Sequence, residues 1–255
     1  MQLSGKVALI TGAGSGIGKA AALLLAKEGA LIGALEMDVE QAKTTVEQIQ
    51  ETGGHAIALK CDVGKPKQVQ AAVDKLIKQW GRLDIVFANA GINGVWAPLE
   101  EIKPEEWDET LDTNLKGTFL TIQAAYPHLK EQGGSIVVTA SVNGTRIFHA
   151  ERVAYACTKA SQVVMVKCLA VEFAKHNVRI NAICPGAIET NIGENTEARN
   201  TSDLGLKVEF PEGRTPLNKG VADQVAHLVL FLASDASNHI SGTEIFIDGA
   251  ETLVG

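Results

Sequence analysis

Short runs of apolar residues, bounded by turn residues, alternate along this chain with longer segments in which apolar positions recur at helical spacing. The apolar runs predict about seven strands: Val7–Ile10, Leu31–Glu36, Ala56–Lys60, Ile85–Ala88, Ser135–Thr139, Arg179–Ile183 and Glu244–Ile247. The helical spacing predicts helices at Gly16–Glu28, Val39–Glu51, Lys67–Trp80, Glu105–Gln132 (broken), Arg152–His176 and Ala222–Ala233. Strands that alternate with helices form parallel sheets covered on both faces. The pattern therefore predicts an α/β fold, a Rossmann-like doubly wound parallel sheet with right-handed crossovers.

No linker, low-complexity stretch or internal repeat interrupts this alternation, so we expect one domain over residues 1–255. The segment 187–220 departs from it because it is long and polar. Long irregular segments inside compact domains are usually lids or binding loops. We therefore expect 187–220 to be a substrate lid. An eight-stranded α/β barrel is the structural alternative, which the unequal helices and the glycine-rich turn after the first strand disfavour.

Charge and composition exclude several classes of protein. The net charge of the 255 residues is −7 and the 23 Lys and Arg are scattered, which argues against a nucleic-acid partner. The N-terminus lacks a signal-like segment and no apolar run approaches about 18 residues, so we expect a cytoplasmic protein without a membrane partner. The four cysteines are far apart and the histidines unpaired, so neither a disulfide framework nor a metal site is predicted.

A glycine-rich turn, Thr11-Gly12-Ala13-Gly14-Ser15-Gly16-Ile17-Gly18, follows the first predicted strand and leads into a helix. There, backbone N–H groups and the helix N-terminus can hold a pyrophosphate. In this interpretation Gly12 permits the tight turn, Gly16 lets a phosphate approach the backbone, and Gly18 lets the helix pack closely on the sheet. The turn predicts a dinucleotide site.

Glu36 ends the second predicted strand, eighteen residues after Gly18. A carboxylate at this position can accept hydrogen bonds from the adenine ribose and repels the 2′-phosphate of NADP. Neither Ser15 nor Met37 supplies a cation for that phosphate. The sequence predicts NAD as the cofactor; a simple strand end at the surface is the alternative interpretation of Glu36.

Tyr155 and Lys159 lie four residues apart on a predicted helix, so their side chains share one face. A nearby ammonium favours the phenolate and brings proton exchange with an alcohol toward working pH. Ser141 lies at the end of the fifth predicted strand, the edge where open α/β sheets bind ligands. The sequence predicts an acid–base site at this edge.

Taken in order, the turn TGAGSGIG, Asn89-Ala90-Gly91, Asn114, Ser141, Tyr155-x-x-x-Lys159 and Pro185-Gly186 resemble the short-chain dehydrogenase/reductase family, single-domain branch, over almost the whole chain. The resemblance implies hydride transfer between a secondary alcohol or ketone and NAD. It implies that Tyr155 is the acid/base, that Ser141 orients the substrate oxygen, and that Lys159 lowers the tyrosine pKa and binds the nicotinamide ribose. Asn114 would hold a water that joins Lys159 to solvent.

The same resemblance implies a cofactor-binding set and a homotetramer. The set is Gly12, Ser15, Gly16, Ile17, Gly18, Glu36, Asp62, Val63, Asn89, Ala90, Gly91, Tyr155, Lys159, Pro185, Gly186, Ile188 and Thr190. Within it, Asp62 and Val63 would contact adenine, and the stretch from Pro185 to Thr190 would hold the nicotinamide carboxamide. The candidate subunit interfaces are the helices Glu105–Gln132 and Arg152–His176.

One departure from the family pattern concerns the substrate side. Thirteen residues separate Ser141 from Tyr155, one more than is usual, which indicates a small insertion in the loop 142–154. Its substrate-side candidates are Val142, Asn143, Phe148 and His149.

The substrate itself stays open. The polar lid favours a sugar, polyol, diol or hydroxy acid, whereas Trp96, Ile147 and Phe148 would suit an aromatic or alicyclic ketone. Reduction of 3-oxoacyl thioesters is an alternative that Glu36 opposes, because that activity usually draws on NADPH. A nucleotide-sugar isomerase or dehydratase would need a different glycine spacing and a larger C-terminal region. A noncatalytic dinucleotide-sensing protein would not need Ser141, Tyr155 and Lys159 together.

Overall fold

Seven parallel strands form the central sheet of the computed structural model, which describes residues 1–202 and 216–254, apart from the side chains of 194 and 195. The strands are β1 (Val7–Thr11), β2 (Leu31–Glu36), β3 (His55–Lys60), β4 (Ile85–Ala88), β5 (Gly134–Thr139), β6 (Val178–Pro185) and β9 (Glu244–Ile247). Their order is β3-β2-β1-β4-β5-β6-β9. This is the doubly wound order, and it confirms the predicted fold class.

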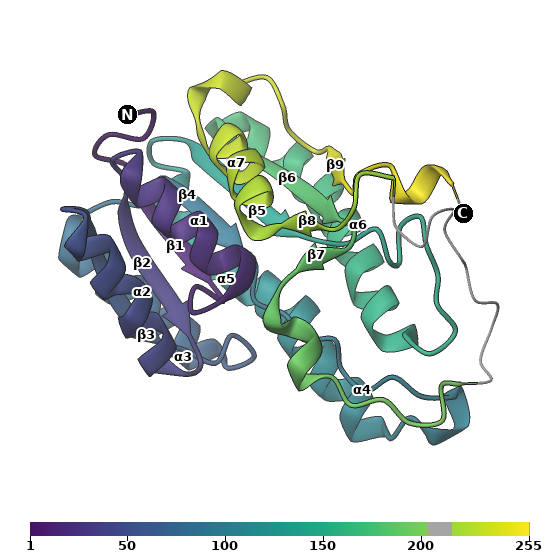
Figure 1. Ribbon diagram of the computed structural model, residues 1–255. Coiled ribbons are helices and arrows are strands. Elements are labelled where there is room, and N and C mark those ends of the chain that lie inside the picture. The colour runs from purple at the N-terminus through teal and green to yellow at the C-terminus, as the bar shows by residue number, and fades with distance from the viewer. Residues whose placement is uncertain (203–215, 255) are drawn as a thin grey trace.

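Helices cover both faces of the sheet (Figure 1). One layer contains α1 (Gly16–Lys27), α2 (Val39–Glu51) and α7 (Ala222–Ala233). The other contains α3 (Pro66–Trp80), α5 (Gly117–Leu129) and α6 (Val153–Phe173), with α4 (Pro104–Leu111) leading toward α5. Short helical turns complete the described chain: η1 (Leu99–Glu101), η3 (Ala174–His176), η4 (Asn191–Asn195), η6 (Asp235–Ser237) and η7 (Glu251–Leu253).

Alternate residues of each central strand feed the two helical layers. In β1, Val7 and Leu9 pack with the α3, α5 and α6 side, while Ala8 and Ile10 pack with the α1, α2 and α7 side, and all four are fully buried. Burying a side chain of the size of Leu or Ile contributes about 1.5–3 kcal/mol. Apolar packing against helices therefore stabilises both faces of the sheet. The carboxyl ends of its parallel strands lie along one edge.

The predicted helix Glu105–Gln132 is broken in a definite way. Between α4 and α5 the residues Asp112–Lys116 form a π-helical turn, η2. Wide turns of this kind occur where a helix admits an extra residue, frequently at functional sites. Here the turn carries Asn114, whose side chain bonds to the backbone of Ile92 after β4. The break therefore ties α4 and α5 to the carboxyl edge of the sheet.

The segment that follows β6 begins and ends in a second, small sheet. Its strands, β7 (Ile188–Glu189) and β8 (Gly220–Val221), pair in parallel. The ends of the predicted lid 187–220 thus lie side by side at the edge of the main sheet, while its stretch 203–215 lies outside the described residues. Within the described ranges, no helix is long and apolar enough to cross a membrane, and no group of three or more His, Cys, Asp or Glu can hold a metal ion.

Candidate active site

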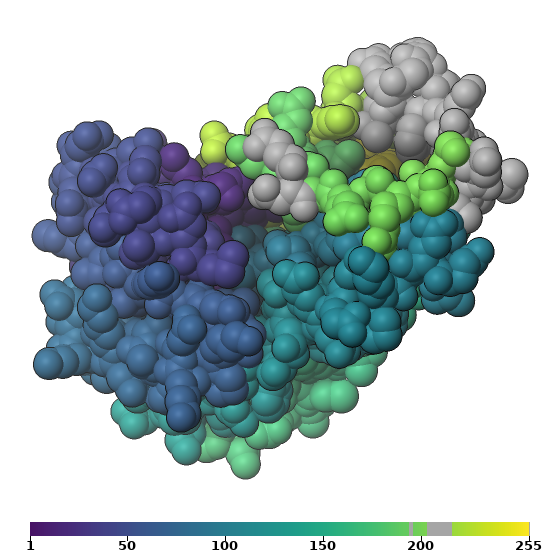
Figure 2. All heavy atoms as spheres, turned by 90° about the horizontal axis from the view of Figure 1, so that it is seen from below, coloured from purple at the N-terminus to yellow at the C-terminus, as the bar shows by residue number. Residues whose placement is uncertain are grey.

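A cleft of about 1020 Å³ runs along the carboxyl edge of the sheet. Figure 2 shows this face of the molecule hollowed between the purple and blue first part of the chain and the teal and green segments. Nearly all of the predicted site residues line it: Gly12, Ser15, Gly16, Ile17, Glu36, Asp62, Val63, Asn89, Ala90, Gly91, Ser141, Tyr155, Lys159, Pro185, Gly186, Ile188 and Thr190. The two that do not, Gly18 and Asn114, are buried behind its wall.

The glycine turn needs its glycines for two physical reasons. Gly12 and Gly16 adopt φ values of +67° and +50°, which side chains rarely tolerate. A Cβ on Gly18 would overlap the carbonyl oxygen of Gly12, so this glycine lets α1 pack on the turn itself. Ser15, the N-cap of α1, makes no capping bond with its side chain. Its hydroxyl and the free N–H groups of the first helical turn are therefore available to an anion.

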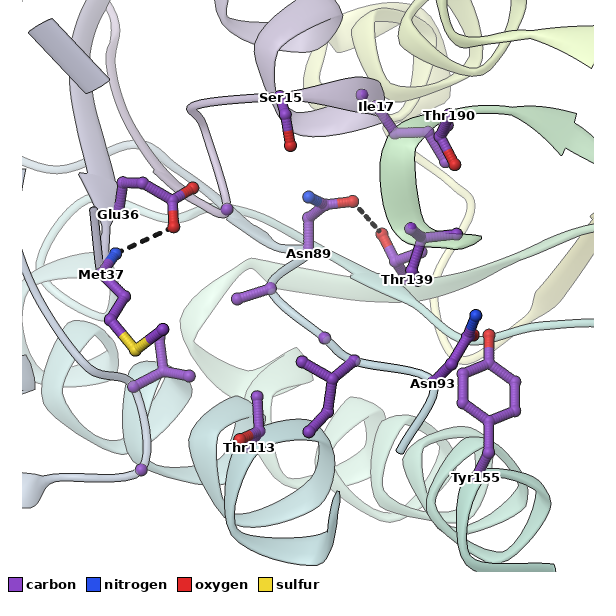
Figure 3. A pocket seen from close by; sticks show the side chains of 18 of the residues that line it. Ser15, Ile17, Glu36, Met37, Asn89, Asn93, Thr113, Thr139, Tyr155 and Thr190 are labelled. Atoms are coloured by element: carbon purple, nitrogen blue, oxygen red, sulfur yellow. Dashed lines mark hydrogen bonds between the residues drawn. The ribbon is translucent and has the colours of Figure 1, made fainter. Parts of the chain in front are cut away.

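The Glu36 carboxylate is fixed at the rim of the cleft (Figure 3). Its Oε2 accepts a hydrogen bond from the N–H of Gly14 (3.1 Å), and its Oε1 accepts one from the N–H of Met37 (2.9 Å). Each carboxylate oxygen keeps a lone pair for a further donor. A negative charge held in place beside the glycine turn favours a hydroxyl donor and repels a phosphate.

Charges of one sign dominate the lining of the cleft. Its cations are Lys65 and Lys159, whereas its carboxylates are Glu36, Asp38, Asp62, Glu105, Asp108, Glu109 and Asp112. Four of these carboxylates, Glu105 to Asp112, lie on α4 and the turn that follows it. The described part of the cleft therefore presents a negative field to an incoming ligand.

The floor of the cleft is a network that joins the ends of three strands. Asn89 donates from Nδ2 to the carbonyl of Thr11 (3.2 Å), and its Oδ1 accepts from Thr139 Oγ1 (3.0 Å; Figure 3). The Thr11 hydroxyl oxygen accepts from the N–H groups of Asn89 and Ala90 at 2.9 and 3.0 Å. Each end of the Asn89 amide thus makes one bond that helps to hold β1, β4 and β5 in place, and each keeps one position for a ligand.

The predicted acid–base residues meet at the far end of the cleft. Tyr155 and Lys159 lie one turn apart on α6, and the Lys159 Nζ is 5.4 Å from the centre of the tyrosine ring. Lys159 is buried and donates to the carbonyl of Thr139 (2.8 Å). Ser141 lines the cleft beside Tyr155, and its Oγ accepts from the N–H of Asn143 (3.1 Å). The structure thus brings Ser141, Tyr155 and Lys159 together.

The pKa values at this end differ from the expectation. Burial raises the pKa of Tyr155, and the bond with Ser141 and the charge of Arg152 lower it by less. Burial also lowers the pKa of Lys159 to about 8. The net shift of the Tyr155 pKa is therefore opposite to the predicted one, because loss of solvation outweighs the nearby charge and hydrogen bond. The contribution of Arg152 was missed because its sequence position gives no sign that it faces the tyrosine.

Asn114 is completely buried in the π-helical turn. Its side chain bonds to both the N–H and the carbonyl of Ile92 (2.8 and 2.9 Å) and donates to Thr158 Oγ1 (3.2 Å). The backbone carbonyl of Asn114 accepts hydrogen bonds from Gln162 Nε2 (2.8 Å) and from the Thr118 hydroxyl (2.7 Å). The expected water relay stays a prediction. Sequence reasoning missed Gln162, because a polar residue within a helix is typical of the solvent-facing side.

The four substrate-side candidates in the loop 142–154 differ in how far they are exposed to solvent. Val142 and Asn143 are buried, whereas Phe148 is 72% exposed. His149 is exposed as well; partial loss of solvation and the charge of Arg152 lower its pKa. The loop is held against α6 by Gly144, because a Cβ there would overlap the Ala156 carbonyl.

The described start of the predicted lid is attached to the other wall of the cleft. Its backbone pairs with Trp96, which accepts from the N–H of Arg199 (2.8 Å) and donates to the carbonyl of Glu197 (2.9 Å). The Arg199 guanidinium forms an ion pair with Glu106 (2.6 Å), and Asn93 donates to Thr196 Oγ1 (2.8 Å). In Figure 2 this green segment runs along the teal residues before and within α4. Two residues of this segment, Asn191 and Ile192, line the cleft.

Comparisons with known proteins identify the relatives of this fold and site. The model of the family described as enoyl-(acyl carrier protein) reductase matches residues 12–250. The crystal structure of a 3-ketoacyl-ACP reductase from Sinorhizobium meliloti 1021 is 49% identical, covering 98% of this chain and 100% of that one, with a TM-score of 0.94. The chain belongs to the short-chain dehydrogenase/reductase family.

Other members of the family resemble the chain over similar lengths. The D-threitol dehydrogenase of Mycolicibacterium smegmatis is 37% identical, over 99% of this chain and 95% of its own. A 3-ketoacyl-(acyl-carrier-protein) reductase from Brucella melitensis, solved in complex with NADH, is 32% identical, covers 98% and 99% of the two chains, and has a TM-score of 0.87. The protein is thus an oxidoreductase of the short-chain family, whose named relatives act on different substrates.

Proposed function

We propose that the protein is an NAD-dependent oxidoreductase that interconverts a secondary alcohol and a ketone. The observation that carries the proposal is that Ser141, Tyr155 and Lys159 meet at one end of a cleft whose other end holds the glycine turn and Glu36. A relative named D-threitol dehydrogenase and a related structure complexed with NADH support the reaction and the cofactor.

The residues of the cleft fit a dinucleotide. The N-terminus of α1 with Ser15 would take the pyrophosphate, and Glu36 the adenine ribose. A Cβ on Gly91 would lie 3.6 Å from Lys159 Nζ, so this glycine keeps the space above the ammonium open for a ribose hydroxyl. When bound, the nicotinamide would supply the acceptor for the hydride that leaves the alcohol carbon.

The protein groups would manage the proton and the oxygen. In oxidation, the alcohol loses a hydride from carbon and a proton from its hydroxyl to Tyr155, which leaves a ketone; in reduction Tyr155 returns the proton. Ser141 would hold the reacting oxygen, since its hydroxyl lines the cleft together with Tyr155 and lowers the pKa of that tyrosine. The Lys159 ammonium would stabilise the phenolate, and Asn114 with its partners would hold the π-helical turn next to Lys159.

Reduction of 3-oxoacyl thioesters is the second candidate, because the 49% identical structure is a 3-ketoacyl-ACP reductase. Glu36 does not separate the two candidates, because the Brucella melitensis structure named as a 3-ketoacyl-(acyl-carrier-protein) reductase is itself in complex with NADH. The carboxylates of α4 line the entrance with negative charge, which disfavours an acidic partner surface and favours the first candidate. The nucleotide-sugar enzymes and the noncatalytic alternative lack a comparable supporting observation.

The test is the variant Tyr155→Phe. Loss of the phenolic proton donor should lower kcat by about 10² to 10⁴-fold and leave NADH affinity nearly intact. Tyr126→Phe is the matched control, since Tyr126 stacks on Phe173 away from the cleft and should keep full activity. Retained turnover in the Tyr155 variant would refute the assignment.

Two expectations accompany the proposed function: cytoplasmic location and a homotetramer. Apolar side chains exposed on α5 and α6, those of Phe119, Val164 and Val171, support an interface on these helices. Light scattering on the purified protein should give the mass of four chains; the 27.0 kDa mass of one chain would contradict the tetramer.

A further inference from the structure

Asn93 lies in the loop after β4 and lines the cleft with a partly exposed side chain. Figure 3 shows its amide and the Tyr155 hydroxyl at the same end of the cleft, the first carried by this loop and the second by α6. The loop also reaches Lys159, since a Cβ on Gly91 would lie 3.6 Å from the lysine Nζ. A ligand that reacts at Tyr155 therefore comes within reach of the Asn93 amide.

A chain of hydrogen bonds fixes this loop to the helix that carries Tyr155. Both the N–H and the carbonyl of Ile92 bond to the Asn114 side chain, which also donates to Thr158 Oγ1 (3.2 Å). Thr158 Oγ1 donates in turn to the Tyr155 carbonyl (2.7 Å). Asn93 directly follows a residue that is held at both of its backbone polar groups, so the fold sets its position relative to Tyr155.

The Asn93 amide also bonds to the described start of the lid. Its Nδ2 donates to Thr196 Oγ1 (2.8 Å), and that hydroxyl donates to the carbonyl of Ile192 (3.0 Å), another residue that lines the cleft. An amide has two donor and two acceptor positions, so it can bind Thr196 and a ligand at the same time. Asn93 therefore joins the reacting end of the cleft to the lid.

The charges of the cleft favour a neutral ligand group at this amide. Four carboxylates of α4 and of the turn after it line the cleft, as described above. Of the two cations in the described lining, Lys65 follows β3, the edge strand remote from Ser141, and Lys159 donates to the Thr139 carbonyl. An anionic substituent beside Asn93 would meet this negative field without a cation of its own, so a neutral group is favoured.

We propose that Asn93 binds a second, neutral hydroxyl of the substrate, on a carbon near the reacting one, and so makes the enzyme selective for diols and polyols over mono-alcohols. A hydroxyl both accepts and donates hydrogen bonds, as the amide does, whereas a ketone or ester oxygen only accepts them. This inference rests on the proposed function, since it names the substrate class of the same site. It assigns Asn93 a role in specificity and leaves the proton to Tyr155.

The kinetic test uses matched pairs of compounds with NAD: butan-2-ol with butane-2,3-diol, and pentan-2-ol with pentane-2,4-diol. In at least one pair the wild type should favour the diol by about 10 to 100-fold in kcat/KM, because a site that binds a hydroxyl rejects the analogue without it. Asn93→Leu, which keeps a similar volume without polar atoms, should reduce that preference below about threefold. Asn93→Ala should do the same without filling the space.

Thr196→Val separates substrate binding from attachment of the lid. It removes the bond to Asn93 Nδ2 and leaves the amide in place. It should therefore raise KM for both members of a pair by a similar factor and keep the preference for the diol. Asn238→Ala, which changes an exposed asparagine beyond α7 and outside the cleft, is the control and should alter neither value.

The two variants give the outcomes that decide the inference. If Asn93→Leu and Thr196→Val both lose the preference for the diol, or both keep it, Asn93 does not itself bind the hydroxyl and the inference is overturned. Equal turnover of the two members of every pair by the wild type would also overturn it, while the proposed function stands. Turnover of none of the four alcohols nor of their ketones, with NADH binding intact, would instead refute the proposed function.

Discussion

The burial of Lys159 has a consequence for stability that can be measured. Its ammonium is enclosed between α6 and the end of β5, where it donates to the Thr139 carbonyl. Burial lowers its pKa from 10.5 to about 8. At neutral pH the folded protein therefore carries a charge that its interior disfavours. Replacing Lys159 by Met, which has a similar length and no charge, should remove that cost.

The size of this free-energy cost, and the sign of its change with pH, follow from the shift of the Lys159 pKa. At about 1.4 kcal/mol per pH unit, a shift from 10.5 to about 8 corresponds to about 3 kcal/mol for holding the charge below pH 8. Above that pH the folded protein releases the proton, while the unfolded chain keeps it up to about pH 10.5. The unfolded state then binds more protons, so the stability of the wild type relative to Lys159→Met rises with pH in this window.

Urea unfolding of both proteins at about pH 7 and about pH 9.5 measures the effect. The difference in unfolding free energy should move by about 2 kcal/mol in favour of the wild type at the higher pH. The hydrogen bond to Thr139 shifts both values by a similar amount and leaves this change intact. Lys167→Met, which removes an exposed lysine from the same helix, is the control and should show no such movement. If the difference in unfolding free energy between the wild type and Lys159→Met is the same at both pH values, the burial cost assigned to Lys159 is refuted.

Three further changes test other parts of the site. Glu36→Ala should lower the preference for NAD over NADP by about 10 to 100-fold in kcat/KM, through loss of charge-assisted hydrogen bonds; an unchanged ratio contradicts the role of Glu36. Gly18→Ala, which places a Cβ against the Gly12 carbonyl, should cost about 1–3 kcal/mol of stability and weaken NADH binding, whereas Gly193→Ala, with open space around it, should do neither. Arg199→Met releases the lid segment from α4 and should raise KM up to about tenfold with little change in melting temperature; a KM equal to that of the wild type argues against the lid.

The elements that rest on local patterns could be predicted from the sequence. The alternation of apolar runs and helical spacing predicted the order of strands and helices, and the glycine turn and Glu36 do line one cleft, as their positions after two neighbouring strands indicate. The pair Tyr155 and Lys159 was predictable for the same reason, because a spacing of four residues on a helix fixes their common face. These features depend on backbone geometry within a few residues.

Features that depend on contacts between distant segments were not predictable. The π-helical turn at Asp112–Lys116 exists because Asn114 binds the backbone of Ile92, and Gln162 takes the Asn114 carbonyl from another helix. The pairing of β7 with β8 involves two residues in each strand, too few for any periodic signal. The sign of the Tyr155 pKa shift depends on how far the side chain is buried, which a sequence does not record.

The measurement that tests the central claim most directly is turnover of a panel of secondary alcohols and ketones, followed by the absorbance of the reduced nicotinamide, with NAD(H) and NADP(H) side by side. The account predicts turnover with NAD(H) on at least one pair of secondary alcohol and ketone, and a silent Tyr155→Phe variant that still binds NADH. Preference for NADP(H), or full activity in that variant, would contradict it.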